Sequence, residues 1–249
     1  MKKNLICISL ILIGFASCKK THPTPVSPAL ISLPADVPGT AITLDSFPLK
    51  IGNQWVYRII TQTTKSESPL SSGTASLSLS TPDSGFLTVG VVSDTLINGF
   101  RLYGLSIPSQ SAFFTYNSIY LSDSFLYANL TDGLHRITAG GNTDSNYVLD
   151  STEALIKLPV AMNTKWSYNY VTRQWTDYVT VTTPAGKFDC VKLSVTENMG
   201  SDLYGMVQYY SSKGLIQELQ WYTSWISAGP GVHDNYTYYT MLTLQSLNF

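Results

Sequence analysis

An internal repeat constrains the fold of this 249-residue chain more than any other feature of its sequence. Segment 47–57 (FPLKIGNQWVY) recurs as segment 158–168 (LPVAMNTKWSY), with proline, tryptophan and tyrosine matched at a constant offset. Gly52 aligns with Asn163, and these residue types tolerate a left-handed backbone turn. Because a tryptophan and a tyrosine two residues apart share one face of a strand, each copy predicts a tight turn and then a strand whose aromatic pair enters a core.

Further landmarks follow each copy of the repeat in the same order. Segment 98–102 follows the first copy and segment 185–190 the second, and both carry a glycine and a phenylalanine. Later, a Gly-Leu pair at Gly133 and another at Gly214 also correspond. We therefore predict two related antiparallel halves, about 47–137 and 158–249. No linker rich in proline and serine separates them, which favours one shared sheet system, with two separate domains as the alternative.

The local pattern after residue 40 is typical of strands joined by tight turns. Residues 76–80 and 179–182 alternate with period two, and residues 55–61 are dense in aromatic and β-branched side chains. Asn98-Gly99 and Asp132-Gly133 are dipeptides that favour tight hairpins. The best helix candidate after the N-terminal segment, 151–157, is short. The sequence predicts an all-β fold, a curved antiparallel sheet or open barrel built from two related halves.

The N-terminal segment predicts export and lipid anchoring. The apolar run at 5–15 follows two lysines and is shorter than the roughly 20 residues that span a bilayer, which suits a signal peptide. Small residues precede Cys18 and resemble the bacterial lipobox, in which the cysteine is lipidated; an ordinary secretory signal is the alternative. We predict a signal peptide at 1–17, a lipidated cysteine and flexible proline-rich tether at 18–40, and a β-rich domain at 41–249.

The residues that follow Cys18 bear on the membrane in which the anchor resides. Lys19 and Lys20 lack the aspartate usual for retention in the inner membrane, and no acidic cluster of the surface-export type follows them. The predicted location is therefore the outer membrane, on its periplasmic face.

Charge and cysteine content restrict the classes of partner and of stabilising bond. Without Lys2 and Lys3, the mature chain has 13 basic residues against 16 acidic ones, a formal net charge of −3. No basic patch indicates nucleic acid as a partner. Once Cys7 is removed with the signal and Cys18 is lipidated, Cys190 is left alone, so no intramolecular disulfide can form, and we interpret Cys190 as a buried, inert thiol.

Three motifs together resemble uncharacterised lipoproteins of Gram-negative bacteria of the Bacteroidota type. They are Pro-Leu-x-x-Gly-Asn-x-Trp-x-Tyr at 48–57, Thr-Pro-Ala-Gly-x-Phe-x-Cys-x-Lys at 183–192 and Tyr-Tyr-x-x-x-Gly-Leu-Ile at 209–216. The resemblance covers about residues 47–220 and implies no established activity. It implies kinship with the curved antiparallel sheets of periplasmic lipoprotein carriers, and hence a concave apolar face able to hold acyl chains.

Signatures of catalysis and of metal binding are incomplete in this sequence. There is no Gly-x-Ser-x-Gly elbow and no His-Glu-x-x-His motif, and beyond the tether the histidines are His135 and His233. We interpret both as structural residues. The oxygen-bearing residues of 142–153 have the spacing of a calcium loop, but Tyr147 replaces its glycine. We expect no enzymatic activity, no cofactor and no bound metal.

Aromatic side chains are the remaining candidates for ligand contact. They gather in the second half of the chain, and the candidates are Trp175, Trp221, Trp225, Tyr236 and Tyr238. The alternative role for such residues is core packing and cross-strand pairing. We predict a non-enzymatic binding or carrier module for an apolar or amphipathic ligand, a lipid or a glycan. A carbohydrate-binding accessory lipoprotein and an assembly partner of another envelope protein are the alternative functions.

Overall fold

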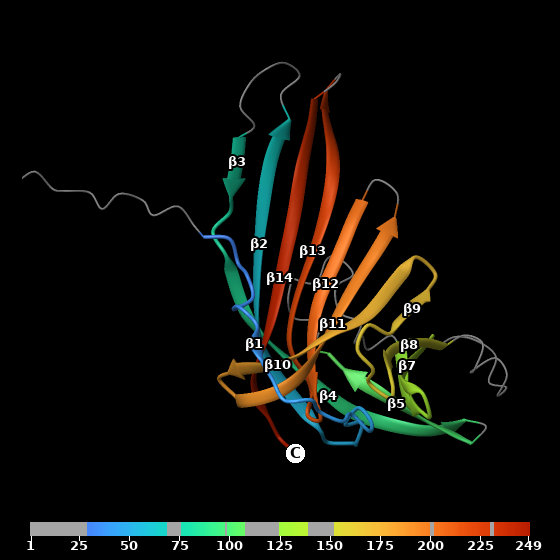
Figure 1. Ribbon diagram of the computed structural model, residues 1–249. Helices are drawn as coiled ribbons and strands as arrows, with labels where there is room; N and C mark the ends of the chain where they lie inside the picture. The colour runs from blue at the N-terminus through green and yellow to red at the C-terminus, as the bar shows by residue number, and fades with distance from the viewer. Residues whose placement is uncertain are drawn as a thin grey trace, which may run out of the picture.

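The computed structural model is all-β, and it describes residues 29–68, 76–97, 99–107, 125–138, 152–199, 202–229 and 232–249 (Figure 1). The strands are β1 (Val37–Pro38), β2 (Gln54–Ser68), β3 (Ser76–Leu79), β4 (Asp83–Ile97), β5 (Phe100–Ser106), β6 (Phe125–Leu130), β7 (Gly133–Thr138), β8 (Thr152–Lys157), β9 (Lys165–Tyr168), β10 (Val171–Thr183), β11 (Gly186–Met199), β12 (Asp202–Ser211), β13 (Gly214–Gly229) and β14 (Val232–Leu247). Within these ranges, no helix has the length and apolar character needed to cross a membrane.

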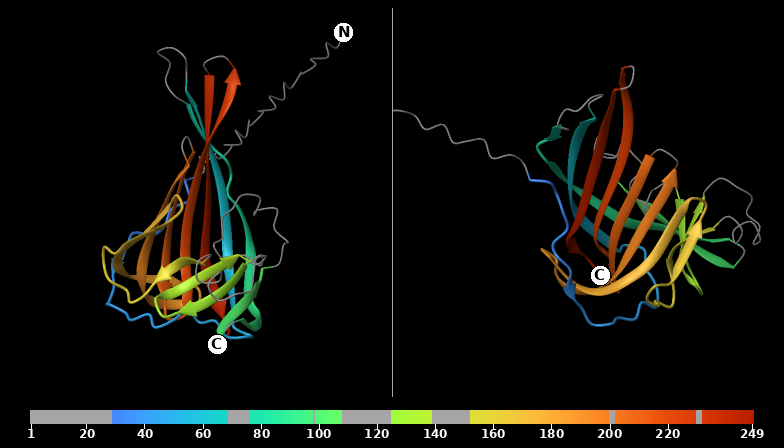
Figure 2. Two further views of the ribbon diagram at one scale, coloured as in Figure 1. Left: turned by 90° about the vertical axis from the view of Figure 1, so that its right-hand side faces the viewer. Right: turned by 45° about the horizontal axis from the view of Figure 1, so that its top comes forward.

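All the described strands belong to one antiparallel sheet, which curves into an open barrel as predicted (Figure 2). The order is β10-β11-β12-β13-β14-β2-β4-β5-β6-β7-β8, while β9 and β1 pair with different parts of β10, and β3 pairs with β2. The second half of the chain thus forms one side of the sheet and the first half the other. The two sides join through a long ladder between β14 and β2.

The two copies of the repeat adopt the same turn. Gly52 has φ +91° and Asn163 has φ +66°, so both occupy the left-handed region. Each is followed by a residue whose amide donates three residues back, Asn53 to the Lys50 carbonyl and Thr164 to the Ala161 carbonyl. The other paired landmarks agree, because Gly99 and Gly186 have positive φ, as do Gly133 and Gly214. The relation of the complete halves, 47–137 and 158–249, stays a prediction.

The barrel has a seam where β8 approaches β9 and β10. No ladder between β8 and either strand joins these described residues, and side chains bridge the seam instead. The indole of Trp166 donates to the Ala154 carbonyl at 2.8 Å, and the indole of Trp175 donates to the Lys157 carbonyl at 3.0 Å. The edge of β8 therefore has two of its carbonyls bonded by tryptophans.

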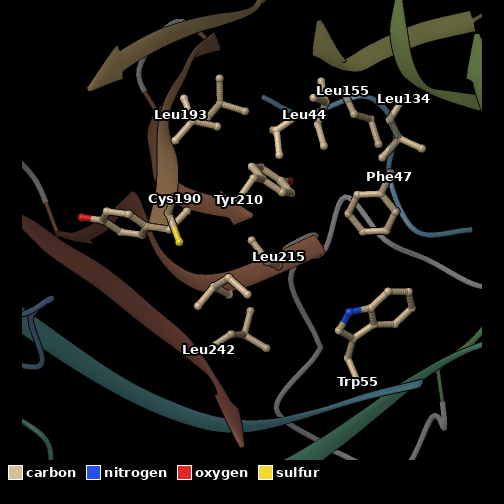
Figure 3. Packing of buried hydrophobic residues seen from close by; sticks show 14 of the residues in the cluster. Leu44, Phe47, Trp55, Leu134, Leu155, Cys190, Leu193, Tyr210, Leu215 and Leu242 are labelled. Atoms are coloured by element: carbon tan, nitrogen blue, oxygen red, sulfur yellow. The ribbon is translucent and has the colours of Figure 1, made fainter. Parts of the chain in front are cut away.

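An apolar core fills the lower interior of the barrel. A row of aromatic contacts crosses it from β9 to β2, through Trp166, Trp175, Tyr210, Phe47 and Trp55, with ring centroids 5.6–6.5 Å apart. Figure 3 shows Phe47, Tyr210 and Trp55 pointing toward one another, with leucines around them. Trp55 and Tyr57 of the first copy and Trp166 of the second are buried in this core, as the Trp-x-Tyr motif predicts, whereas Tyr168 is only partly buried and lies outside the core cluster.

Residues 152–157, within the short helix candidate, form strand β8 through pairing with β7, which agrees with the all-β prediction. One sequence prediction about local structure is wrong. Residues 29–40, predicted as tether, pack on the sheet instead. The amide of Gly39 donates to the Tyr178 carbonyl, and a side chain on Gly39 would collide with the backbone of Val179. Residues 1–28, with Cys18, lie outside the described residues.

Candidate functional site

On β13, inward-facing positions change from apolar to polar along the strand, while the facing residues Met206 of β12 and Leu242 of β14 stay in the apolar core. On β13, Ile216 lies in the core, whereas Glu218, Gln220 and Tyr222 follow it on the same face. Glu218 lies opposite core residue Leu242 of β14, so register places its side chain inside the barrel. We call this level the inner polar belt. It comprises Lys65, Glu153, Arg173, Glu197, Tyr204, Gln208, Glu218, Gln220, Tyr222, Tyr236 and Tyr238.

The centre of the belt consists of buried amides and one buried carboxyl group. Gln208, Glu218 and Gln220 are 3%, 1% and 3% exposed. Gln208 Nε2 donates to Glu218 Oε2 at 2.7 Å, and the Tyr204 hydroxyl donates to Gln220 Oε1 at 3.1 Å. Burial raises the pKa of Glu218 to about 8, against a smaller lowering by the hydrogen bond from Gln208. This carboxyl group is therefore largely protonated at neutral pH.

Two polar atoms at this centre have no partner among the described residues. They are Glu218 Oε1 and Gln220 Nε2, the ends of the two side chains that the bonds above leave unused. An unsatisfied buried donor or acceptor costs about 1–3 kcal/mol, and buried polar groups are paired in most proteins. Such atoms in the interior of a barrel are candidates for contact with a ligand.

A ladder of tyrosines forms the upper rim of the belt. The ring of Tyr238 stacks with Tyr222 at 6.3 Å and with Tyr236 at 6.5 Å, at interplanar angles of 23° and 20°. Lys65 Nζ lies 5.8 Å from the centroid of the Tyr236 ring and 3.0 Å from Asp234 Oδ2. Tyr238 is 39% exposed, so the ladder extends from the buried centre to solvent.

The belt reaches the seam of the barrel through a buried ion cluster. The carboxylate of Glu153 on β8 accepts hydrogen bonds from Arg173 on β10 and from Arg136 on β7. Burial, and to a smaller extent the charge of Glu153, raise the pKa of nearby Glu197, and the charge of Arg173 partly offsets this increase. Glu153, the last residue of the calcium-like spacing at 142–153, therefore binds two arginines. Positions 142–150 of that loop lie outside the described residues.

The five aromatic residues predicted to face a ligand separate into different environments. Trp175 is fully buried in the core, so its assignment as ligand-facing is wrong, because the edge of β8 binds its indole. Trp221 lies on the outer face, where its ring covers Gly205. The side chain of Trp225 lies outside the described part. Tyr236 and Tyr238 are on the inner face and belong to the belt.

The remaining single residues considered from the sequence have structural surroundings. His135 is buried, with Nε2 2.8 Å from Asp132 Oδ1 and Nδ1 3.1 Å from Thr152 Oγ1, so both ring nitrogens have partners. The side chain of His233 lies outside the described residues. Cys190 is a free, fully buried thiol, as predicted, and burial raises its pKa to about 12.

Sequence reasoning missed the centre of the belt. Glu218 and Gln220 lie in a segment that also carries Leu219 and Trp221, and alternation assigns the apolar pair to the interior. The structure shows the reverse, since Glu218 pairs with core residue Leu242 and Tyr222 pairs with Tyr238. A β-bulge between β12 and β13 hides this from the sequence, because Leu215 and Ile216 next to it both lie in the core and give no single parity.

Comparison with known proteins gives remote structural similarity alone. No family model and no curated protein matches the sequence. The chain is similar to a Bacteroides fragilis protein described as a "putative exported protein with YmcC-like fold", with 11% identity, a TM-score of 0.37, and 83% of this chain and 100% of that chain covered. It is also similar to a "putative lipoprotein" from Parabacteroides distasonis, with 14% identity, a TM-score of 0.32, and 84% and 100% covered.

Proposed function

We propose that this protein is a non-enzymatic binding module of the bacterial cell envelope, anchored by lipid at Cys18, whose inner polar belt receives an amphipathic ligand. The observation that carries the proposal is the pair of unpartnered buried atoms, Glu218 Oε1 and Gln220 Nε2. A ligand that hydrogen-bonds to these two atoms would remove the cost of leaving them buried and unsatisfied, and this contributes to its binding free energy. The belt groups are amides, phenols, carboxyls and the cationic groups of Lys65 and Arg173, and several of them hydrogen-bond to one another.

The position of the belt supports an amphipathic ligand over a purely apolar one. Apolar side chains and the aromatic row fill the lower interior. A pocket there, lined by residues such as Leu44, Phe47 and Tyr210, has a free volume of about 10 Å³, the space of one water molecule. A ligand at the belt would meet phenol rings and hydrogen-bonding groups together.

The tyrosine ladder supports a glycan as a second candidate ligand. Parallel rings with hydroxyl groups, partly exposed at Tyr238, combine an apolar surface with polar edges, as sugar rings also do. Glycan binding would make the protein a carbohydrate-binding accessory lipoprotein. A protein partner in the envelope would instead engage the outer surface and leave the belt unaffected.

Native mass spectrometry of lipidated protein, extracted gently from its own membranes, tests the proposal. We expect a bound lipid or glycan in the wild type and a lower occupancy in Gln220→Leu. Asp45→Asn, which alters an exposed residue outside the belt, is the control. Equal occupancy in wild type and Gln220→Leu, or protein free of ligand in every preparation, would contradict the proposal.

The predicted location is tested separately. We propose an anchor in the outer membrane, on the periplasmic side, and Cys18→Ala should then move the protein from the membrane to the soluble fraction. Retention of Cys18→Ala in the membrane would exclude lipid at this residue as the anchor. Protease added to intact cells distinguishes the periplasmic side, where the protein stays protected, from the cell surface.

A further inference from the structure

We propose that Glu218 and Gln220 form a subsite for an uncharged carbonyl oxygen of the ligand. This inference rests on the proposed function and specifies the chemistry of its site. Glu218 and Gln220 are two residues apart on β13, so their side chains project from the same face at about 7 Å spacing. Both are at least nine-tenths buried and face the barrel interior.

The existing hydrogen bonds determine which atom of each side chain is available. Glu218 uses Oε2 to accept from Gln208, which leaves Oε1. Gln220 uses Oε1 to accept from the Tyr204 hydroxyl, which leaves the amide nitrogen Nε2 as a donor. The two supporting residues both lie on β12, so the ladder between β12 and β13 orients the pair.

The protonation state makes the subsite a pair of donors. With Oε2 occupied as an acceptor, the proton of the neutral carboxyl group resides on Oε1. Tyr57 of β2 is the titratable group whose charge couples to Glu218; it donates to the Leu215 carbonyl, and burial raises its pKa well above 10, so it stays neutral. The facing residues Gln208 and Leu242 are uncharged.

Two neutral donors in a desolvated interior select an uncharged acceptor. A ligand ammonium would face the N–H groups of Gln220, and a ligand carboxylate would require burial of a charge without a cation beside it. An amide or ester carbonyl accepts two hydrogen bonds and carries no charge. The acetamido group of an amino sugar and the ester group of an acylated lipid both present this oxygen.

Matched probes separate the two sources of the carbonyl. Purified full-length lipidated protein in detergent is titrated with a trimer of N-acetylglucosamine and with a trimer of glucose, which lacks the acetamido group. In the second arm it is titrated with a short-chain diacyl phosphatidylcholine and with its ether-linked analogue, which lacks both carbonyls. Calorimetry measures each affinity. We expect one carbonyl-bearing probe to bind about tenfold or more tightly than its analogue.

Variants at the two positions identify the donors. Gln220→Leu should lose the preference for the carbonyl-bearing probe. Glu218→Gln places an amide where the neutral carboxyl group stood, with one acceptor and a donor, so it should retain the preference, whereas Glu218→Leu should lose it. The wild type should bind about tenfold more weakly one unit above the pKa of Glu218 than well below it, and Glu218→Gln should not. Circular dichroism verifies that each variant is folded.

The outcomes distinguish this subsite from the proposed function. The subsite is supported if the wild type prefers the carbonyl-bearing probe in either arm, if Gln220→Leu loses this preference and if Glu218→Gln keeps it. The arm that shows the preference then identifies whether the carbonyl comes from a glycan or from a lipid. Equal affinity for a probe and its analogue overturns the subsite while ligand binding stands. Binding by Glu218→Gln that is as weak as binding by Glu218→Leu overturns the subsite in the same way. Absence of binding in both arms overturns the subsite and the ligand class from which the proposed function was built.

Discussion

The protonated state of Glu218 predicts an unusual dependence of stability on pH. In the folded protein, burial raises the pKa of this carboxyl group from 4.5 to about 8. In the unfolded chain it titrates near its ordinary value. Between these two values the folded state holds one proton more than the unfolded state, so the free energy of unfolding decreases as pH rises. Below the lower value both states are protonated and the effect vanishes.

The magnitude follows from this difference of one proton. Stability should fall by about 1.4 kcal/mol for each pH unit between the two pKa values, or about 3 kcal/mol from pH 5 to pH 7. Glu218→Gln abolishes this titration while it preserves an acceptor for Gln208. The free energy of unfolding of Glu218→Gln, relative to that of the wild type, should therefore increase steadily from pH 5 to pH 7. Burial of the carboxyl is almost complete, so solvent screening is a small correction.

Urea denaturation of both proteins at pH 5, 6 and 7 measures the effect. Other titrating groups, Glu197 among them, remain in both proteins and cancel in the difference between the two unfolding free energies. Asp45→Asn, a substitution at an exposed residue outside the belt, is measured in parallel as the control. Parallel curves for the wild type and Glu218→Gln from pH 5 to pH 7 would refute the assignment of a buried, protonated carboxyl.

Other changes test the turns, the seam and the core. Gly133→Ala should lower the free energy of unfolding by about 3 kcal/mol, because φ is +139° and the new Cβ would lie 1.8 Å from the Ile156 carbonyl oxygen. Gly52→Ala, at φ +91° with open space around it, should lower the free energy of unfolding by about 1 kcal/mol. Equal losses for the two variants in urea titrations would exclude the collision at Gly133. Trp175→Phe removes the indole donor to the Lys157 carbonyl and should cost about 2 kcal/mol, with faster amide exchange in β8; unchanged exchange would mean that the indole does not secure this edge. Cys190, buried and with a pKa of about 12, should react with iodoacetamide at pH 8 only as fast as the protein unfolds, and prompt labelling of the folded protein would contradict its burial.

The turns could be predicted from the sequence because their chemistry is local. A backbone with positive φ favours glycine or asparagine wherever it occurs, and the paired landmarks at Gly52 and Asn163, Gly99 and Gly186, and Gly133 and Gly214 all have positive φ. The all-β class follows for a similar reason, since short alternating runs between such turns pair with their neighbours in sequence. Each of these features depends on a few adjacent residues.

The inner face could not be predicted because it depends on contacts between distant residues. On β2, Gln62 faces outward, yet it is buried, because the Ala29 and Ser80 carbonyls accept hydrogen bonds from it and the Ile31 amide donates to it. Asp36 likewise covers the outer face through Tyr209 and Lys192. A segment predicted to be a solvated tether thus makes part of the outer face an interior. Polarity alone then no longer identifies which side of a strand lies inside the barrel.

The distribution of polar groups within the barrel is the strongest physical indication that its interior serves a purpose besides stability. At the level of Glu218, leucine or methionine would fill the same volume without an unsatisfied atom, and well-packed apolar replacements of buried polar groups are often neutral or stabilising. The strand has such residues available, since Leu219 and Trp221 alternate with the pair on the outer face. Apolar side chains surround the polar pair, since Leu242 lies opposite Glu218 and Met206 lies opposite Gln220 in the core. The amides of Gln208 and Gln220 and the carboxyl of Glu218 are therefore polar groups among apolar neighbours, with two atoms unpartnered within the described residues, and the proposed ligand contact accounts for them.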